Sequence, residues 1–143
     1  MSRHCWSMRR VLLLPVVATG LALAGCSSQF PEFAKESVEE VKIHEGGVKV
    51  SSRDPAKIES LLAALRDAQA TKDHKCGDSG EVFLGKKGGE EIRLGILPGH
   101  NDQYYEFRLY RGRGYAIYRV QREGFLKAMA ALGVKNLDPG GPE

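Results

Sequence analysis

Four strand-like runs between positions 81 and 120 constrain the fold of this chain more than any other feature, and two of them alternate apolar with polar residues. Ile92, Leu94 and Ile96 alternate with polar residues or glycine, which is the period of a strand with one buried face. The predicted strands cover residues 81–84, 91–97, 104–110 and 115–120, and short turns containing glycine separate them. Four such strands in succession predict an antiparallel meander.

The segment before the meander predicts two strands and one helix. Residues 38–44 and 48–51 are strand-like and flank a short Glu-Gly-Gly turn. Asp54 and Pro55 are typical of a helix start, because proline suits the first helical position and aspartate caps it. An apolar stripe at helical spacing follows, formed by Ile58, Leu61, Leu62 and Leu65. We expect this helix to run from residue 55 to about residue 70.

A second helix is expected at the end of the domain. Phe125, Met129 and Leu132 lie on one helical face, and Gly133 follows where a glycine C-cap belongs. The element order predicts an α+β fold: a curved antiparallel sheet of about five to six strands with both helices packed on one face. The expected division is a leader over residues 1–25, a tether over 26–37, one domain over 38–137 and a flexible tail over 138–143.

The first residues have the layout of a secretion signal. Arginines end a positive region at position 10, and a 14-residue apolar stretch over positions 11–24 follows, which is too short to span a bilayer. The stretch leads to Leu23-Ala24-Gly25-Cys26, which resembles the lipobox of bacterial lipoproteins at every position. The resemblance implies cleavage between Gly25 and Cys26, diacylglyceryl transfer to the Cys26 thiol and acylation of the new N-terminus.

The resemblance also implies a location. Two or three acyl chains would hold the mature protein firmly on the lipid bilayer. Ser27 resembles the residue that follows the cysteine in outer-membrane lipoproteins, so we expect the inner leaflet of the outer membrane, facing the periplasm, with the inner membrane as the alternative. Export by the general route is preferred over a twin-arginine reading of Arg9-Arg10, and translation starts at Met1 or at Met8.

The charge balance argues against nucleic acid as a partner. The whole chain has 21 Lys and Arg against 18 Asp and Glu, a formal charge of +3. Three of the basic residues, Arg3, Arg9 and Arg10, belong to the leader, so the mature chain carries no net charge. A nucleic-acid interface therefore lacks its electrostatic basis.

Cysteine counting leaves one thiol without a partner. Of Cys5, Cys26 and Cys76, the first leaves with the leader and the second is lipidated. An intramolecular disulfide is thus excluded in the mature chain. Three interpretations of Cys76 stay open: a buried inert thiol, a disulfide to another chain, or a reactive or metal-binding thiol.

Two loops carry weak candidates for chemistry. His74 and Cys76, with Asp73 and Asp78 beside them, offer metal ligands, but no second Cys/His pair completes a zinc spacing. His100 and Asp102 could share a proton, although His-Asn-Asp after glycine is more typical of a turn, which is the interpretation we prefer. We therefore expect no metal and no cofactor, and a cysteine hydrolase would need a histidine close to Cys76.

The last two strands interleave arginines with tyrosines. One sheet face could bind an anionic headgroup, a glycan or a protein through stacking and forked hydrogen bonds, but the interpretation we prefer is a solvated face paired with glutamates. The candidate surface consists of Arg108, Tyr110, Arg111, Arg113, Tyr115 and Tyr118.

Phosphate loops, dinucleotide fingerprints and serine nucleophile motifs do not occur in the sequence. The function we expect is therefore a membrane-anchored, non-enzymatic binding or structural module of the bacterial envelope, with an envelope protein or glycan as partner. The alternative is a periplasmic thiol- or metal-dependent protein, or a hydrolase, that uses Cys76 with His74 or His100.

Overall fold

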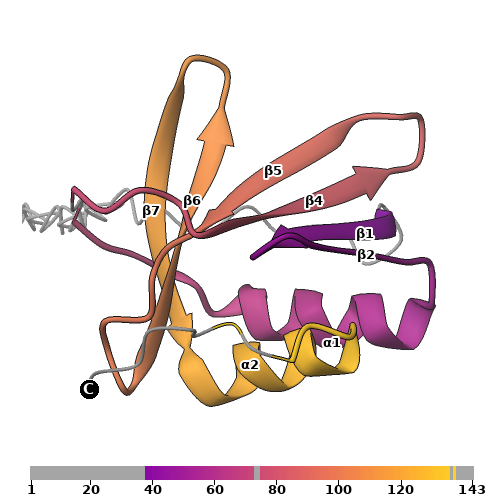
Figure 1. Cartoon of the computed structure of the whole chain (residues 1–143). Helices are drawn as coiled ribbons and strands as arrows, with labels where there is room; N and C mark the ends of the chain where they lie inside the picture. Colours follow the sequence, from indigo (N-terminus) through magenta and orange to yellow (C-terminus); the bar gives the residue numbers. More distant parts are fainter. Residues whose placement is uncertain (1–37, 73–74, 136, 138–143) are drawn as a thin grey trace, which may run out of the picture.

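The four strand-like runs form consecutive strands of one antiparallel sheet in the computed structural model, which describes residues 38–72, 75–135 and 137. The sheet has seven strands in the order β2-β1-β4-β5-β6-β7-β3, and it does not close on itself. Two helices pack on one face of it (Figure 1), which confirms the predicted α+β fold with a curved sheet. The strands are β1 (Val38–Glu45), β2 (Val48–Ser52), β3 (Gln69–Ala70), β4 (Gly80–Lys86), β5 (Glu91–Ile96), β6 (Tyr104–Arg111) and β7 (Gly114–Gln121).

The first helix, α1 (Pro55–Arg66), begins where the sequence predicts and ends earlier. The Asp54 side chain accepts hydrogen bonds from the backbone N–H groups of Ala56 and Lys57, as an N-cap should. The expected extension to residue 70 is wrong, because Gln69 and Ala70 form β3 and pair with β7. This added strand also accounts for a sheet slightly wider than expected.

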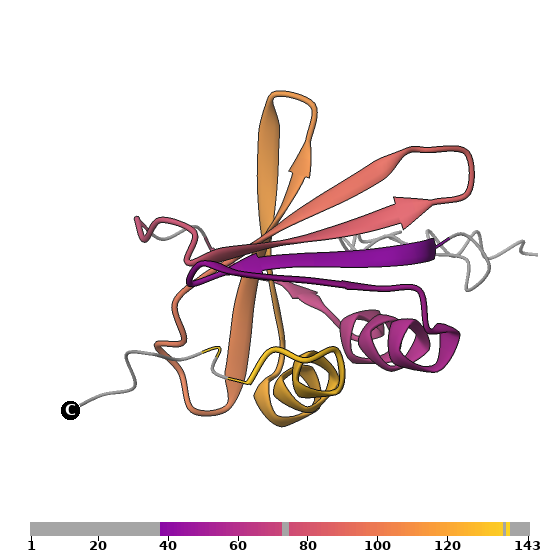
Figure 2. The ribbon, with the colours of Figure 1, turned by 45° about the vertical axis from the view of Figure 1, so that its right-hand side comes forward.

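The second helix, α2 (Arg122–Ala131), starts directly after β7. Gly133 has a φ of +101°, the left-handed conformation that a C-cap glycine supplies. The two helices contact each other, with α1 also against β1 and α2 against β6 and β7. Figure 2 shows both helices on the same side of the sheet.

The core lies between this helix pair and the inner face of the sheet. Each strand of the meander contributes alternate side chains, and Tyr105, Phe107 and Leu109 of β6 are all buried. From α1 the four predicted stripe residues are buried, and from α2 Phe125 and Met129. The predicted inward positions are therefore confirmed, and the residues between them form the outer face.

The sheet has a narrow seam in its middle. Three residue pairs join β5 to β6, namely Leu94 with Leu109, Gly95 with Arg108 and Ile96 with Phe107. One further backbone hydrogen bond, from the N–H of Leu97 to the carbonyl oxygen of Glu106, follows them. Beyond the seam the β4–β5 and β6–β7 hairpins separate, as both Figure 1 and Figure 2 show. On the outer face, side chains of β5, β6 and β7 meet between the two hairpins. We call this group, Arg93, Arg108, Tyr110 and Tyr115, the wedge.

Candidate functional site

A hydrogen-bonded network links the loop before β4 to the outer face of β6. Arg108 donates through Nη1 to Asp78 Oδ1 and through Nη2 to the carbonyl oxygen of Cys76, the latter at 2.5 Å. The Tyr110 hydroxyl donates to Asp78 Oδ2 at 2.5 Å. Charge-assisted bonds of this kind are stronger than neutral ones, and Arg108 is only 7% exposed. The network therefore fastens residues 76–78 to the outer face of β6.

A glycine in β5 makes room for this network. A Cβ atom built on Gly95 would overlap the carboxylate of Asp78. Any larger residue at position 95 would displace Asp78. The lack of a side chain on Gly95 therefore lets the Asp78 carboxylate approach β5 closely. The hydrogen bond to Asp78, helped by partial burial, also raises the pKa of the Tyr110 hydroxyl.

Guanidinium groups and aromatic rings make up the wedge. The Arg93 guanidinium carbon lies 4.2 Å from the centroid of the Tyr110 ring, and that of Arg108 lies 5.0 Å from the Tyr115 ring. The two tyrosine rings meet edge to face with centroids 5.9 Å apart. Arg93 Nε also donates to Glu81 at 2.7 Å, which fixes the guanidinium over the ring. The four side chains of the wedge are thus pre-arranged.

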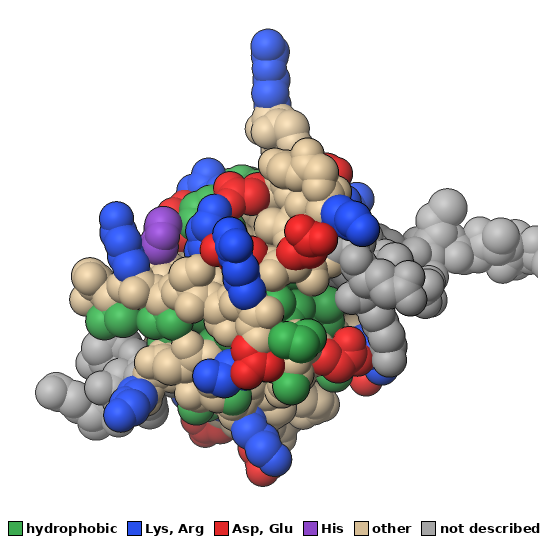
Figure 3. Space-filling model, turned by 90° about the vertical axis from the view of Figure 1, so that its right-hand side faces the viewer, with side chains coloured by type: hydrophobic (Ala, Val, Ile, Leu, Met, Phe, Trp, Pro, Cys, Tyr) green, Lys and Arg blue, Asp and Glu red, His purple; other side chains and the backbone are tan. Residues whose placement is uncertain are grey.

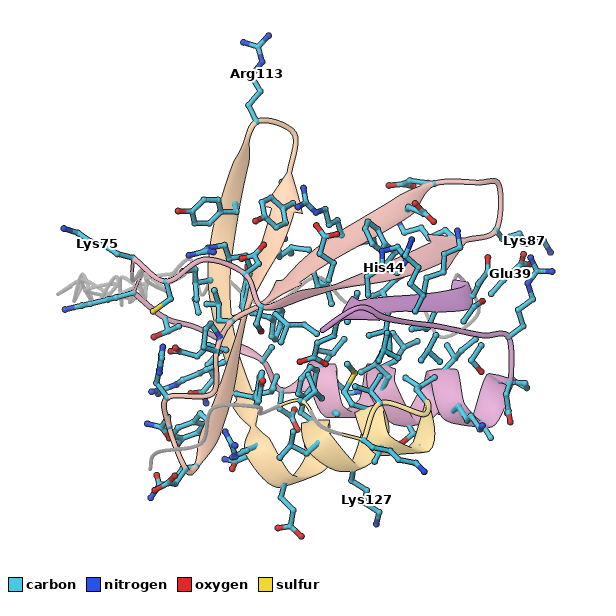
Figure 4. The ribbon with its side chains drawn as sticks, viewed as in Figure 1. Glu39, His44, Lys75, Lys87, Arg113 and Lys127 are labelled. Carbon is cyan, nitrogen blue, oxygen red and sulfur yellow. The ribbon has the colours of Figure 1, made fainter. Side chains whose placement is uncertain are left out.

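The structure places the six residues of the predicted Arg/Tyr surface in three environments. Tyr118 faces the core, is 2% exposed and stacks on Phe107, so it does not belong to a surface. Arg108 is on the outer face but is buried by its bonds to the loop, so it positions its neighbours. Tyr115 is 47% exposed, Tyr110 is half-buried, and Arg111 and Arg113 are exposed, with Arg113 at the hairpin tip in Figure 4.

The correction has a simple physical reason. Residues on one strand face are two positions apart, and Tyr118 is out of phase with Tyr115. Sequence reasoning also missed Arg93, which lies on β5, and the role of Asp78. Arg93 alternates with Ile92 and Leu94, so its outward direction was available from the pattern, whereas the splay that brings it over Tyr110 was not.

A thiol and an imidazole meet at the other end of the network. Cys76 Sγ lies 3.1 Å from His100 Nε2, although the two residues are 24 positions apart. Asn101 organises the turn beside His100 by accepting hydrogen bonds from the backbone N–H groups of Gln103 and Tyr104. His100 is exposed and Cys76 is partly exposed. The geometry allows His100 to accept the thiol proton.

The other candidates for chemistry do not join this pair within the described part of the chain. Asp102 is exposed, and among the described residues no hydrogen bond or ion pair links it to His100. His74 lies outside the described residues, as do Gly25 and Cys26. No group of three or more His, Cys, Asp or Glu suited to a metal ion occurs among residues 38–72, 75–135 and 137.

The face shown in Figure 3 carries basic and acidic side chains interspersed, with apolar side chains between them. Within the described ranges no helix is long and apolar enough to cross a membrane. Comparison of the chain with protein-family models, with curated proteins and with solved structures finds no match.

Proposed function

We propose that this chain is the precursor of a membrane-anchored bacterial envelope lipoprotein whose domain is a non-enzymatic binding module. The lipobox over Leu23–Cys26 supports the anchor, with Cys26 as the acylated residue and the outer membrane as the destination. A lipid-anchored protein acts on neighbours within reach of its tether. The proposed partner is accordingly another component of the envelope, a protein or a glycan.

The wedge is the observation that carries the binding role. Tyrosine and arginine side chains supply large contact areas and directional donors, and both are enriched where proteins bind partners. Here salt bridges and hydrogen bonds fix them before any partner arrives, so binding would order few side chains. The exposed residues in reach of a partner are Tyr115, Arg111 and Arg113.

The position of the anchor suits this role. Val38 pairs with Lys86, so the tether joins the domain at the β4–β5 turn. Figure 4 shows Glu39 and Lys87 at that end, whereas Lys75 lies at the opposite end and Arg113 at the tip of the second hairpin. The tip of the second hairpin, with Arg113, therefore lies apart from the point where the tether would begin.

Mass spectrometry of the protein from its native host tests the anchor. We expect a chain that begins at Cys26 and carries diacylglyceryl and acyl masses. A chain that retains residues 1–25, or a processed terminus without lipid, contradicts the proposed location.

A pair of variants tests the binding surface. In envelope cross-linking and in sedimentation with purified peptidoglycan, Tyr115→Ala and Arg113→Ala should lose the partner that the unaltered protein retains. Lys127→Ala, on the exposed side of α2 in Figure 4, is the matched control and should retain it. If all the variants retain the partner equally, the wedge is not the binding surface.

The 3.1 Å contact between Cys76 and His100 favours a second candidate, a reactive thiol. Proton transfer from Sγ to Nε2 would leave a thiolate, the nucleophilic form of cysteine. We expect iodoacetamide to label Cys76 in the folded protein and His100→Gln to slow labelling about tenfold or more. An unlabelled Cys76, or a rate that does not change in His100→Gln, rules this candidate out.

A further inference from the structure

The turn between β1 and β2 closes over an unusual buried carboxylate. Glu45 is the last residue of β1, and Gly46 and Gly47 both adopt positive φ values, +52° and +81°, in the turn that follows. Val41, Ile43 and Glu45 share the inner face of the strand. Glu45 therefore points to the same side as the core, and its side chain packs over Gly80, which has no side chain to obstruct it.

Neither oxygen of this carboxylate has a partner among the described residues. Glu45 is 8% exposed, and both Oε1 and Oε2 are buried without a hydrogen bond. An ionised carboxylate in this state is expensive, because it has lost water and gained nothing in return. Burial alone raises its pKa. Most buried polar groups in proteins have partners, so the exception requires an explanation.

Glu45 lines a concavity of about 420 Å³ together with the turn and the segment after α2. The apolar side chains of Val48 and Val134 form its walls, Ser79 adds a hydroxyl, and Lys135 stands at its edge. Val48 is 53% exposed, an unusual position for a large apolar residue beside a buried charge. A second concavity of about 340 Å³ adjoins it through Glu45, Gly46, Val48 and Ser79. These volumes are in the range of small-molecule sites.

We propose that this concavity is a binding site for a small organic cation, a primary ammonium group on a short apolar stem, with Glu45 as the counter-charge. A small rotation of the Glu45 side chain would bring its buried oxygens to the surface of the concavity, where the ammonium would donate hydrogen bonds to them and to the Ser79 hydroxyl. The stem would lie between Val48 and Val134. The larger concavity has no acidic or imidazole side chain besides Glu45 in its lining, which makes it a poor metal site, and no metal-type cluster occurs in the described part of the chain. An organic cation needs only one counter-charge and an apolar wall.

The lysines nearest to the two concavities do not serve as the counter-charge of Glu45. Lys135 lines the same concavity and Lys49 the adjoining one, yet within the described ranges neither forms an ion pair with Glu45. By contrast Glu81, at the neighbouring position of β4, is paired with Arg93. Glu81 therefore already has a counter-charge, whereas Glu45 has none among the described residues.

Titration of the detergent-solubilised full chain with n-butylammonium, followed by amide chemical shifts, tests the site. We expect saturable shifts at Gly46, Val48, Ser79 and Val134, whereas n-butanol, which has the same stem without the charge, should give none of them. A peptide lysine is distinguished by Nα-acetyl-lysine amide. Binding of this probe would mean that the site accepts a protein side chain, and its exclusion would mean a free amine.

Glu45→Gln should weaken n-butylammonium binding at least tenfold, since it removes the charge and keeps the shape. Glu81→Gln is the matched control and should leave the affinity within twofold. Val48→Ser should weaken binding severalfold, and because Val48 is exposed this variant keeps its fold. Absence of shifts in the unaltered protein, or equal affinity in Glu45→Gln, would overturn the proposal.

Discussion

Two carboxylates lie close to the start of β4 and are buried in contrasting ways. Asp78, on the outer face, accepts hydrogen bonds from Arg108 and Tyr110, and its side chain is 15% exposed. Glu45, on the inner side, is at least as buried and receives none from the described residues. The comparison teaches that burial alone does not define a structural ion pair. Asp78 holds a loop in place, whereas the carboxylate of Glu45 stays uncompensated beside a cavity.

Removing the partner of Asp78 should have the largest effect. Arg108→Met leaves a buried carboxylate without its counter-charge, and we expect the free energy of unfolding to fall by about 3 kcal/mol. Urea denaturation of the full chain in a neutral detergent measures it. Adding Asp78→Asn should recover part of the loss, because the uncompensated charge disappears. Strictly additive losses in the double variant would show that the two side chains do not interact.

Filling the space below Asp78 should cost somewhat less. Gly95→Ala forces the carboxylate away from Arg108 and Tyr110, and we expect a loss of about 2 kcal/mol, typical of overpacking. Gly85→Ala on β4 is the matched control, since its Cβ would meet Glu40 at 3.5 Å, an ordinary contact. The same denaturation experiment compares them. A Gly85→Ala variant as unstable as Gly95→Ala would mean that strand glycines matter here for backbone reasons only.

Neutralising Glu45 should have the smallest effect and the opposite sign. Burial raises the pKa of Glu45 above 4.5, so the folded state holds this proton more tightly than the unfolded chain. The stability that results is complete below the ordinary value and is lost as the pH rises through the raised pKa. At neutral pH we expect Glu45→Gln to be more stable than the unaltered protein by about 1 kcal/mol.

The same variant sharpens the comparison through its pH dependence. The gain in Glu45→Gln should shrink toward zero near pH 4, where the unaltered protein carries a neutral Glu45 as well. Melting temperatures of both proteins between pH 4 and pH 8 give the curve. If the gain persists unchanged in acid, an unpaired charge is not its cause.

Much of the fold follows from local pattern, and the exceptions depend on distant partners. Asp54 and Pro55 mark the start of α1 because a cap acts on the next two or three residues. Its end is set by Gln69 and Ala70, whose partners Arg119 and Tyr118 are about 50 positions away. Propensity over residues 67–70 carries no information about such a pairing.

The candidate site, too, combines features that follow from local pattern with features that depend on distant contacts. That Tyr110 and Tyr115 share the outer face was predictable from alternation, and alternation read carefully would have placed Tyr118 inside and Glu45 beside Ile43. The contact between Cys76 and His100 was not predictable, because two irregular loops determine it. Nor was the Asp78–Arg108 ion pair, which depends on a loop folding back over Gly95.

The narrow seam between β5 and β6 also bears on how the molecule avoids self-association. Past the three joined pairs, the strand edges at Glu91–Arg93 and Tyr110–Arg111 lie at the wedge and do not pair with each other. Edges of this kind invite an extended segment from another molecule, and proteins commonly blunt them with charged side chains. Arg93, which is bonded to Glu81 and lies over Tyr110, is a charged side chain in such a position. Replacing Arg93 by a small residue would expose both the backbone of β5 and the ring of Tyr110. We expect such a variant to form oligomers or fibrils.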